Sequence, residues 1–313
     1  MLGEVEKRSG SRVEAGTLEC RRCDGRYGIT RGVPRFVTSN NYAASFGLQW
    51  TQHSRIQYDS YNGTRLSEER FFWETKWPRA MRGDVILEVG SGAGRFTEQA
   101  ASTGAVVVSL DYSDAVEANH VLNGGKDNVI VVQGDIYRLP VPDGRFDRVF
   151  CFGVLQHTPS PRAAFLQLPR CLKPGGSLAV DVYRKWTGLK RLLDTKYWLR
   201  PVTRRMAPEQ LYDWVRCYIE AMWRPSGLLA RIPYLGVRVN QKLLIADYRG
   251  SYRLPDTMLR EWAILDTFDM LASTHDYPQS AEAVRRWFSD ARLVDVEIWT
   301  ENALIVGCAR KPE

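Results

Sequence analysis

The sequence lacks the features that define several classes of protein. No run of about 18 apolar residues occurs in its 313 residues, which excludes a membrane-spanning helix. The segment Met1 to Arg8 contains no apolar stretch, so we expect no secretory signal peptide. Six cysteines are scattered along the chain, too dispersed for a disulfide framework. We therefore place the protein in a reducing cytoplasm.

The remaining composition is that of an ordinary globular chain, with 44% hydrophobic and 25% charged residues. Its positive charge is concentrated in one segment. Residues 184–253 contain fifteen Lys and Arg against five Asp and Glu, a net +10 in a chain whose total is +7. Such a segment fits an anionic ligand or surface, although a solvated helical face would carry the same charge.

Short apolar runs alternate with helical patterns between Asp84 and Tyr183. Five runs are predicted as strands: 85–89, 106–110, 129–132, 146–151 and 177–182. Helical patterns at 95–102 and 113–122 separate the first three. This alternation predicts a parallel sheet built from right-handed crossovers. A helix at 280–289 and an antiparallel pair at 293–299 and 303–309 follow near the end of the chain.

We divide the chain into four parts at these changes in composition and in the predicted pattern of strands and helices. Residues 1–40 form a short cysteine-bearing segment, and residues 41–83 form an aromatic-rich cap over the active site. The ligand-binding core comprises 84–183 and 280–313. The insertion 184–279 has helical spacing and is predicted to form a helical lid over the substrate.

A glycine-rich loop, Glu88-Val89-Gly90-Ser91-Gly92-Ala93-Gly94, follows the first predicted strand of the core. Glycines there let the backbone turn tightly and approach a ligand at the sheet edge. The dinucleotide fingerprint would need a glycine where Arg95 stands, and the carboxylate of Glu88 favours a cationic ligand over a pyrophosphate. A tight strand-to-helix turn without a ligand would need the same glycines.

Two further acids stand at strand ends. Asp111 ends the second strand, where a carboxylate accepts hydrogen bonds from ribose hydroxyls. Asp135 follows the third strand, where it would meet an adenine amino group. Each acid alone is often a cap or turn residue. With Glu88, however, they form a series on one sheet edge, which indicates a nucleoside ligand.

Together these features resemble a class I S-adenosylmethionine-dependent methyltransferase of the type 11, ubiquinone-methyltransferase-like kind. The resemblance covers Asp84 to Tyr183 closely and resumes at the carboxyl end. The motifs that carry it are Ile86 to Phe96, Asp111, Gly134 to Ile136, Phe146 to Val149, Val154 to Pro159 and Leu172 to Gly176. It implies a Rossmann-like α/β fold, with seven strands, one of them reversed, and helices on both faces. The implied cofactor is S-adenosyl-L-methionine, with S-adenosyl-L-homocysteine as its product.

The resemblance also assigns roles to the residues at the strand ends. Glu88, Gly90 and Gly92 would approach the methionine part of the cofactor. Asp111 would hold the ribose, with Tyr112 beside the adenine, and Asp135 and Ile136 would meet the base. Phe152, Gly153 and Val154 would form the floor of the site near the sulfonium.

The segments before the core resemble known accessories of such enzymes. The first forty residues are similar to the latter half of a zinc ribbon, but they hold one pair, Cys20 and Cys23, where tetrahedral zinc needs four ligands. We expect a degenerate, metal-free ribbon; a metal shared between chains is the alternative. The segment Tyr42 to Trp50 resembles one found in sugar- and natural-product-cluster methyltransferases. It offers Tyr42, Gln49 and Trp50 to the substrate pocket, unless they merely pack under a loop.

An alcohol acceptor must lose a proton as it attacks the methyl group, so a positioned base helps the reaction. His157 follows the fourth strand and is the first candidate; its alternative role is to cap the next helix. His275 is the second candidate. Asp266, Asp269 and Tyr277 are candidate substrate contacts. We expect no metal in the reaction.

The sequence therefore predicts a small-molecule methyltransferase that O-methylates a sugar-like or natural-product acceptor. The basic, tryptophan-rich insertion fits a phosphate-bearing or lipid-linked acceptor and is compatible with peripheral membrane contact. No Asn-Pro-Pro-Tyr type motif follows the fourth strand, so methylation of a nucleobase exocyclic amine is disfavoured. We do not expect a nucleic-acid partner.

Three alternatives stay open, and the oligomeric state is not predicted. An RNA methyltransferase is supported by the sequence pI near 9.1. A methyltransferase-fold enzyme that cyclises the aminoalkyl chain of S-adenosylmethionine would use the same pocket. A non-catalytic module would bind the cofactor without any turnover.

Overall fold

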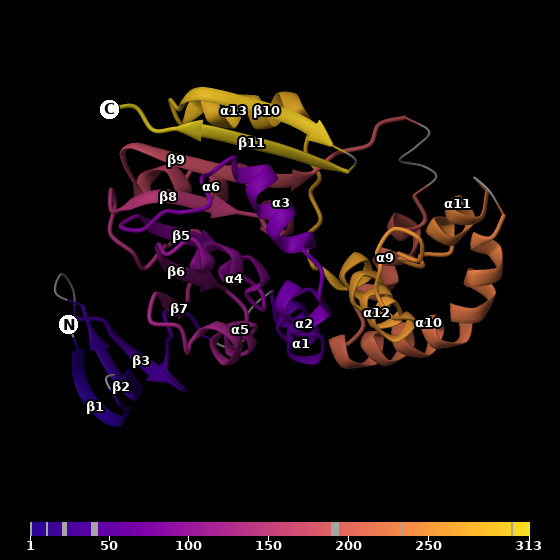
Figure 1. Ribbon diagram of the computed structural model, residues 1–313, viewed down its shortest axis with the longest axis horizontal. Helices are drawn as coiled ribbons and strands as arrows, with labels where there is room; N and C mark the ends of the chain where they lie inside the picture. Colours follow the sequence, from indigo (N-terminus) through magenta and orange to yellow (C-terminus); the bar gives the residue numbers. More distant parts are fainter. Residues whose placement is uncertain are drawn as a thin grey trace. The chain divides into compact units, whose positions relative to one another are not determined.

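The computed structural model describes residues 2–10, 12–20, 24–38, 43–188, 194–232, 235–301 and 303–313. The chain divides into two compact units (Figure 1). The first unit comprises residues 1–41, 66–185 and 275–313, and the second comprises 42–65 and 186–274.

The first unit is built on a seven-stranded sheet. Its strands are β5 (Val85–Val89), β6 (Val106–Asp111), β7 (Val129–Gln133), β8 (Phe146–Cys151), β9 (Leu172–Tyr183), β10 (Val294–Glu301) and β11 (Leu304–Arg310). Their order is β10-β11-β9-β8-β5-β6-β7, which Figure 1 shows from one edge to the other. Strands β5 to β9 pair in parallel, and β11 is antiparallel to both of its neighbours. The predicted sheet with one reversed strand is confirmed.

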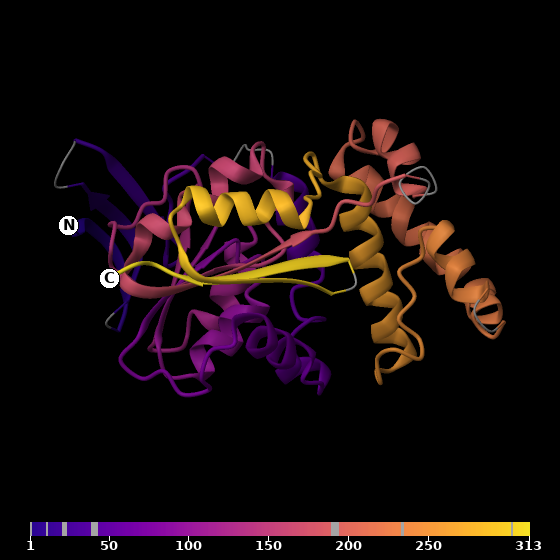
Figure 2. The same cartoon turned by 90° about the horizontal axis from the view of Figure 1, so that it is seen from above.

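Helices cover both faces of the sheet, because its central strands are apolar on both sides. One face carries α3 (Leu66–Thr75), α4 (Arg95–Ser102) and α5 (Val116–Asn123), with a core around Phe71, Phe96 and Val116. The other carries α6 (Pro161–Phe165), α7 (Leu168–Cys171) and α13 (Ala281–Asp290), with Phe165 and Phe288 in its core. Figure 2 shows α13 along one side of β10 and β11.

The strand order places a topological switch point beside β5. The chain runs from β5 to β6 and β7 on one side, then crosses to β8 and β9 on the other. At such a point the loops leave the carboxyl ends of adjacent strands in opposite directions and open a crevice, where α/β proteins bind their ligands.

Four short strands between Leu2 and Pro34 form a separate antiparallel sheet within this unit. Its strands are β1 (Leu2–Ser9), β2 (Arg12–Glu19), β3 (Arg26–Thr30) and β4 (Val33–Pro34). The segment after β4 joins the edge of the large sheet: Phe36 N donates to Gln133 O over 2.9 Å, and Arg35 Nη1 donates to Gln133 Oε1 over 2.7 Å.

The expected zinc-ribbon remnant falls in this small sheet. Cys20 is exposed, and Cys23 lies outside the described residues. Among the residues that the structure describes, no three His, Cys, Asp or Glu side chains are grouped to hold a metal. The metal state of the segment stays a prediction.

The second unit is helical. It consists of α1 (Ala44–Gln52), α2 (Asp59–Asn62), α9 (Lys196–Thr203), α10 (Pro208–Ala230), α11 (Leu235–Lys242) and α12 (Asp256–Ala272). Its core gathers Leu211, Val215 and Ile219 of α10 against Leu259 and Phe268 of α12. Within the described ranges, no helix combines the length and the apolar character needed to cross a bilayer.

Candidate active site

The predicted cofactor residues gather at the carboxyl ends of four adjacent parallel strands. The register pairs Val89 of β5 with Leu110 of β6, and Asp111 of β6 with Gln133 of β7. The loops that carry these residues therefore leave the sheet at one level, on either side of the switch point.

The glycine-rich loop turns through backbone conformations that other residues rarely adopt. Gly90 has a φ of 85°, and Gly94 has a φ of 93°. The amides of Gly90 and Ser91 donate to Leu110 O over 2.7 and 3.0 Å, which ties the loop to β6. A Cβ atom on Gly90 would stand 2.1 Å from Cγ2 of Val154. Glycine is needed here because the loop presses against the predicted floor of the site.

Glu88 is buried in a polar cluster below this loop. Its Oε2 accepts hydrogen bonds from the hydroxyls of Thr97 and Ser109, the latter over 2.8 Å. Asn119 Nδ2 donates in turn to Ser109 Oγ over 2.8 Å. Burial raises the pKa of Glu88 to about 7, although both hydroxyl bonds oppose the shift. The carboxylate therefore braces α4 against β6, and its predicted contact with the methionine part stays a prediction.

Asp111 is held in one orientation at the tip of β6. Its Oδ2 accepts from Gly92 N over 2.8 Å, and its Oδ1 accepts from Ser113 N over 2.8 Å and from Ser113 Oγ over 2.7 Å. Burial raises its pKa, and the bonds from Ser113 and Gly92 lower it in part. Tyr112 beside it is partly buried, and burial together with Asp135 raises the pKa of its phenol.

The remaining predicted cofactor residues follow β7 and β8. Asp135 Oδ1 accepts from Tyr137 N over 2.9 Å, and Ile136 is buried in the core. Phe152 packs edge-on against Phe96, with ring centroids 5.4 Å apart. The floor of the site after β8 is therefore apolar, whereas carboxylates, those of Asp111 and Asp135, stand at the ends of β6 and β7.

A buried ion-pair network lies beside the floor and was missed from the sequence. Asp181 on β9 accepts hydrogen bonds from Gly153 N and from Arg70 of α3. Arg70 Nε also donates to Glu74 Oε1 over 2.6 Å. Burial, followed by the charge of Asp181, raises the pKa of Glu74. An acid within the apolar strand 177–182 was the only signal, and it does not reveal its partner.

The two candidate bases are brought together. His157 ends a 3-10 turn after β8 (Leu155–His157), and its Nδ1 lies 3.0 Å from the carbonyl oxygen of His275. The His275 ring stacks on Tyr277 at 5.7 Å, and Tyr277 N donates to Gln156 O over 2.8 Å. Helix α6 has Ser160 at its N-cap, so His157 does not occupy the capping position.

The other substrate candidates lie in the second unit, except Tyr42, which falls outside the described residues. Gln49 of α1 is buried, and Trp50 is partly exposed. Asp266 of α12 accepts a hydrogen bond from Tyr248, and Asp269 is partly exposed one turn later. Their roles toward a substrate stay predictions.

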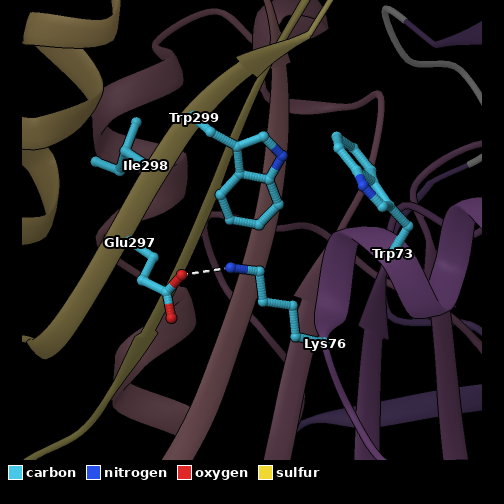
Figure 3. Close-up of a pocket in the computed structure, with 5 residues that line it drawn as sticks. All are labelled: Trp73, Lys76, Glu297, Ile298 and Trp299. Atoms are coloured by element: carbon cyan, nitrogen blue, oxygen red, sulfur yellow. Dashed lines mark hydrogen bonds and ion pairs between the residues drawn. The ribbon is translucent and has the colours of Figure 1, made fainter.

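A shallow surface pocket lies elsewhere on the first unit, between α3 and β10 (Figure 3). Lys76 pairs with Glu297 there, and its Nζ lies 4.4 Å from the ring centroid of Trp299. Trp73 and Ile298 complete the lining. Strands β11 and β9 separate β10 from β8, so this pocket is not part of the switch-point crevice.

Comparisons with known proteins agree with this geometry. A family model described as a methyltransferase domain matches residues 87–180. The ubiquinone biosynthesis O-methyltransferase of Acinetobacter baumannii (strain AYE) is 30% identical over 202 residues, covering 61% of this chain and 78% of the relative. The chain belongs to the class I S-adenosylmethionine-dependent methyltransferases.

Other relatives of this methyltransferase match over shorter lengths. The sterol 24-C-methyltransferase of Eremothecium gossypii is 36% identical over 103 residues, 31% of this chain and 28% of the relative. An uncharacterized methyltransferase of Arabidopsis thaliana is 28% identical, covering 46% of this chain and 42% of its own length. The chain thus spans less than half of these two curated relatives. A solved structure, human N-acetylserotonin methyltransferase in complex with SAM, has a TM-score of 0.46 and 14% identity, covering 86% of this chain and 57% of that chain.

S-adenosylmethionine is the cofactor of this methyltransferase class, and the residues at the strand ends fit it. The loop at Gly90 has no room for a side chain, because a Cβ atom there would meet Val154, so the backbone of the loop stays close to the carboxyl end of β8. The carboxylates of Asp111 and Asp135 suit the hydroxyls and amino group of a nucleoside. The assignment of single residues to parts of the cofactor stays a prediction.

Proposed function

We propose that this methyltransferase transfers the methyl group of S-adenosylmethionine to a hydroxyl of a small molecule of the sugar-like or natural-product class. The observation that carries the oxygen specificity is the contact between His157 and the carbonyl of His275. The ubiquinone biosynthesis relative, an O-methyltransferase by name, supports the same direction.

The contact fixes the tautomer of His157. A carbonyl oxygen only accepts hydrogen bonds, so Nδ1 of the neutral ring carries the proton and Nε2 is the basic nitrogen. Burial, followed by the charge of His157, lowers the pKa of His275. His157 therefore has the electronic state of a general base, three residues beyond Val154 of the floor.

The division of labour follows from these positions. The cofactor supplies an activated methyl group. The glycine-rich loop and Asp111 hold the nucleoside, and the floor around Phe152 excludes water from one side. Holding an acceptor hydroxyl in line with the methyl group is worth about 7–11 kcal/mol of the barrier. His157 Nε2 accepts the hydroxyl proton as the oxygen attacks, and the His275 carbonyl stabilises the resulting imidazolium.

The charge of the insertion supports an anionic acceptor. Residues 184–253 carry a net +10, and several of these cations are already paired, as Arg249 is with Asp247 and Arg216 is with Asp213. A phosphate-bearing acceptor complements the net positive charge of this segment. We include such acceptors in the proposal on this ground.

Product analysis with a panel of hydroxylated acceptors tests the proposal. We expect a methylated product and an equal amount of S-adenosylhomocysteine. His157→Gln should lower kcat by about 10²–10⁴-fold and leave the affinity for S-adenosylhomocysteine unchanged. His120→Gln, a histidine of α5 away from the strand ends, is the matched control. A fully active His157→Gln variant would remove the base from the mechanism.

The open alternatives give different products in the same assay. A cyclised aminoalkyl product without any methylated acceptor would replace methyl transfer by cyclisation. Methylated RNA with no methylated small molecule would change the substrate class. Cofactor binding without turnover of any acceptor would indicate a binding module.

A further inference from the structure

Helix α9, Lys196–Thr203, is inverted relative to an ordinary surface helix. Its buried side chains are polar: Arg200 is 7% exposed and Thr203 is 6% exposed. Its outward side chains are apolar: Trp198 is 64% exposed, Leu199 is 40% exposed and Val202 is 65% exposed. A surface helix normally turns its apolar stripe inward and its charges outward.

The inversion has a structural cause at the end of α12. Arg200 Nη1 donates to Met270 O and to Ser273 Oγ, both over 2.9 Å, and Nη2 donates to Ser273 O over 2.6 Å. Thr203 Oγ1 donates to Leu271 O over 3.0 Å. The last carbonyls of a helix have no partner within it, and α9 supplies that partner. Because these bonds fix the rotation of α9, they also hold its apolar side chains toward the outside.

The exposed apolar side chains are grouped rather than scattered. Single exposed apolar residues are normal on a soluble protein, and Val121 of α5, 74% exposed, is one of them. Three on one face of an eight-residue helix form a local patch of the kind that marks an interaction site. Tryptophan, with its apolar ring and polar N–H, is the residue that favours the boundary between lipid and water.

Positive charge borders this patch. Arg204 and Arg205 follow the helix directly, and both are exposed. They belong to the segment 184–253 with its net +10. An apolar face beside exposed cations complements a surface that is negatively charged outside and apolar within, as an anionic lipid bilayer is. A nucleic acid would attract the arginines but would offer no apolar phase to Leu199 and Val202.

We propose that α9 is a peripheral membrane anchor that lies in the surface of a bilayer containing anionic phospholipids. Trp198, Leu199 and Val202 enter the boundary between headgroups and acyl chains, and Arg204 and Arg205 stay at the level of the phosphates. A helix of eight residues is about 12 Å long, far short of the roughly 30 Å of a hydrocarbon core, so it rests on the membrane and does not cross it. The anchor is already ordered by α12, so docking requires no folding. The inference does not depend on which acceptor is methylated.

Vesicle sedimentation of the whole chain tests the anchor. We expect co-sedimentation with vesicles of phosphatidylcholine mixed with phosphatidylglycerol, weaker binding to phosphatidylcholine alone, and a decrease as salt rises. Val202→Glu should lower the partition coefficient about tenfold or more, since it removes one buried apolar side chain and adds a repelled charge. The double change Arg204→Gln with Arg205→Gln should lower it about fivefold for each charge removed.

The controls keep the test independent of folding. Val121→Glu makes the same substitution at an exposed valine of the first unit and should bind vesicles as the native chain does. All these sites are exposed, so circular dichroism should be unchanged. Equal binding by the Val202→Glu and native chains would overturn the proposal, as would no binding to either vesicle. A dimer that Val202→Glu dissociates, with no vesicle binding, would make this face a contact between copies and overturn it too.

Discussion

The substitution Glu88→Gln tests whether burial disfavours the ionised form of the side chain below the glycine-rich loop. Glu88 is buried and receives two hydroxyl hydrogen bonds, but its desolvation outweighs them, and its pKa is raised from 4.5 to about 7. In the folded chain without cofactor, the side chain therefore resists ionisation at neutral pH.

The size of the effect follows from the shift. A raised folded-state pKa means that the stabilising contribution of Glu88 is complete below about pH 4.5 and is lost as the pH rises through about 7. The rise of the pKa from 4.5 to about 7, at about 1.36 kcal/mol per pH unit, makes the folded chain about 3 kcal/mol less stable above that window. Glutamine keeps the shape and carries no charge. The free energy of unfolding of Glu88→Gln, relative to the native chain, should therefore rise by about 3 kcal/mol between pH 4.5 and pH 8.5.

Urea unfolding at several pH values measures this difference. The quantity to compare is the pH dependence of the difference, because any constant offset from altered hydrogen bonds cancels. Glu282→Gln, at an exposed position on α13 with an i,i+4 ion pair to Arg286, is the matched control and should change stability by less than about 0.5 kcal/mol at every pH. A pH-independent difference for Glu88→Gln would show that Glu88 ionises normally and would refute the reasoning.

Three further substitutions probe the same unit. Arg70→Met should lower the free energy of unfolding by about 3–5 kcal/mol, because it leaves two buried carboxylates without their cation. In the same urea assay, Arg286→Met on the surface should lower it by less than about 1 kcal/mol. Equal losses from the two substitutions would contradict the ion-pair network. Gly94→Ala should destabilise the chain by several kcal/mol and lower the melting temperature. Gly94 has a φ of 93°, and a Cβ atom there would stand 2.1 Å from Asn119 Oδ1. An unchanged melting temperature would mean that the loop adapts. Asp111→Asn should weaken S-adenosylhomocysteine binding about 10- to 100-fold in calorimetry through loss of charge-assisted hydrogen bonds, and native affinity would remove Asp111 from the ribose site.

The sheet could be predicted because its signals are local. Strands 85–89 and 146–151 have the predicted bounds, since most of their residues are apolar and buried, although Glu88 interrupts the first run and Asp147 and Arg148 interrupt the second. Strand β9 begins at Leu172, five residues before the predicted start. Its first residue pairs with Phe146 across an irregularity in the ladder, and Gly175, with a φ of 73°, lets the chain continue beyond it. A strand that begins with a glycine-containing irregularity of this kind does not show its first residues as an apolar run in the sequence.

The long-range contacts of the site could not be predicted. Asp181 and Arg70 are 111 positions apart, and an acid in an apolar strand shows that a partner is needed without showing which one. The contact between His157 and His275 spans 118 positions across the whole insertion. The pattern of α9 by itself would turn Trp198 inward and Arg200 outward. The carbonyls at the end of α12 reverse this, and no spacing within the helix encodes them.

The two edge strands of the large sheet, β7 and β10, differ in the features that keep them from pairing with a strand of another molecule. At β7, the backbone after the small amino-terminal sheet occupies a hydrogen-bonding position of the outermost strand. At β10, the ladder shifts between Val294 and Glu297, and Asp295 takes a φ of 52°. An edge strand with such an irregularity is a poor template for pairing with another chain. We therefore expect the large sheet to resist edge-to-edge pairing between molecules, even where the protein is crowded on a surface.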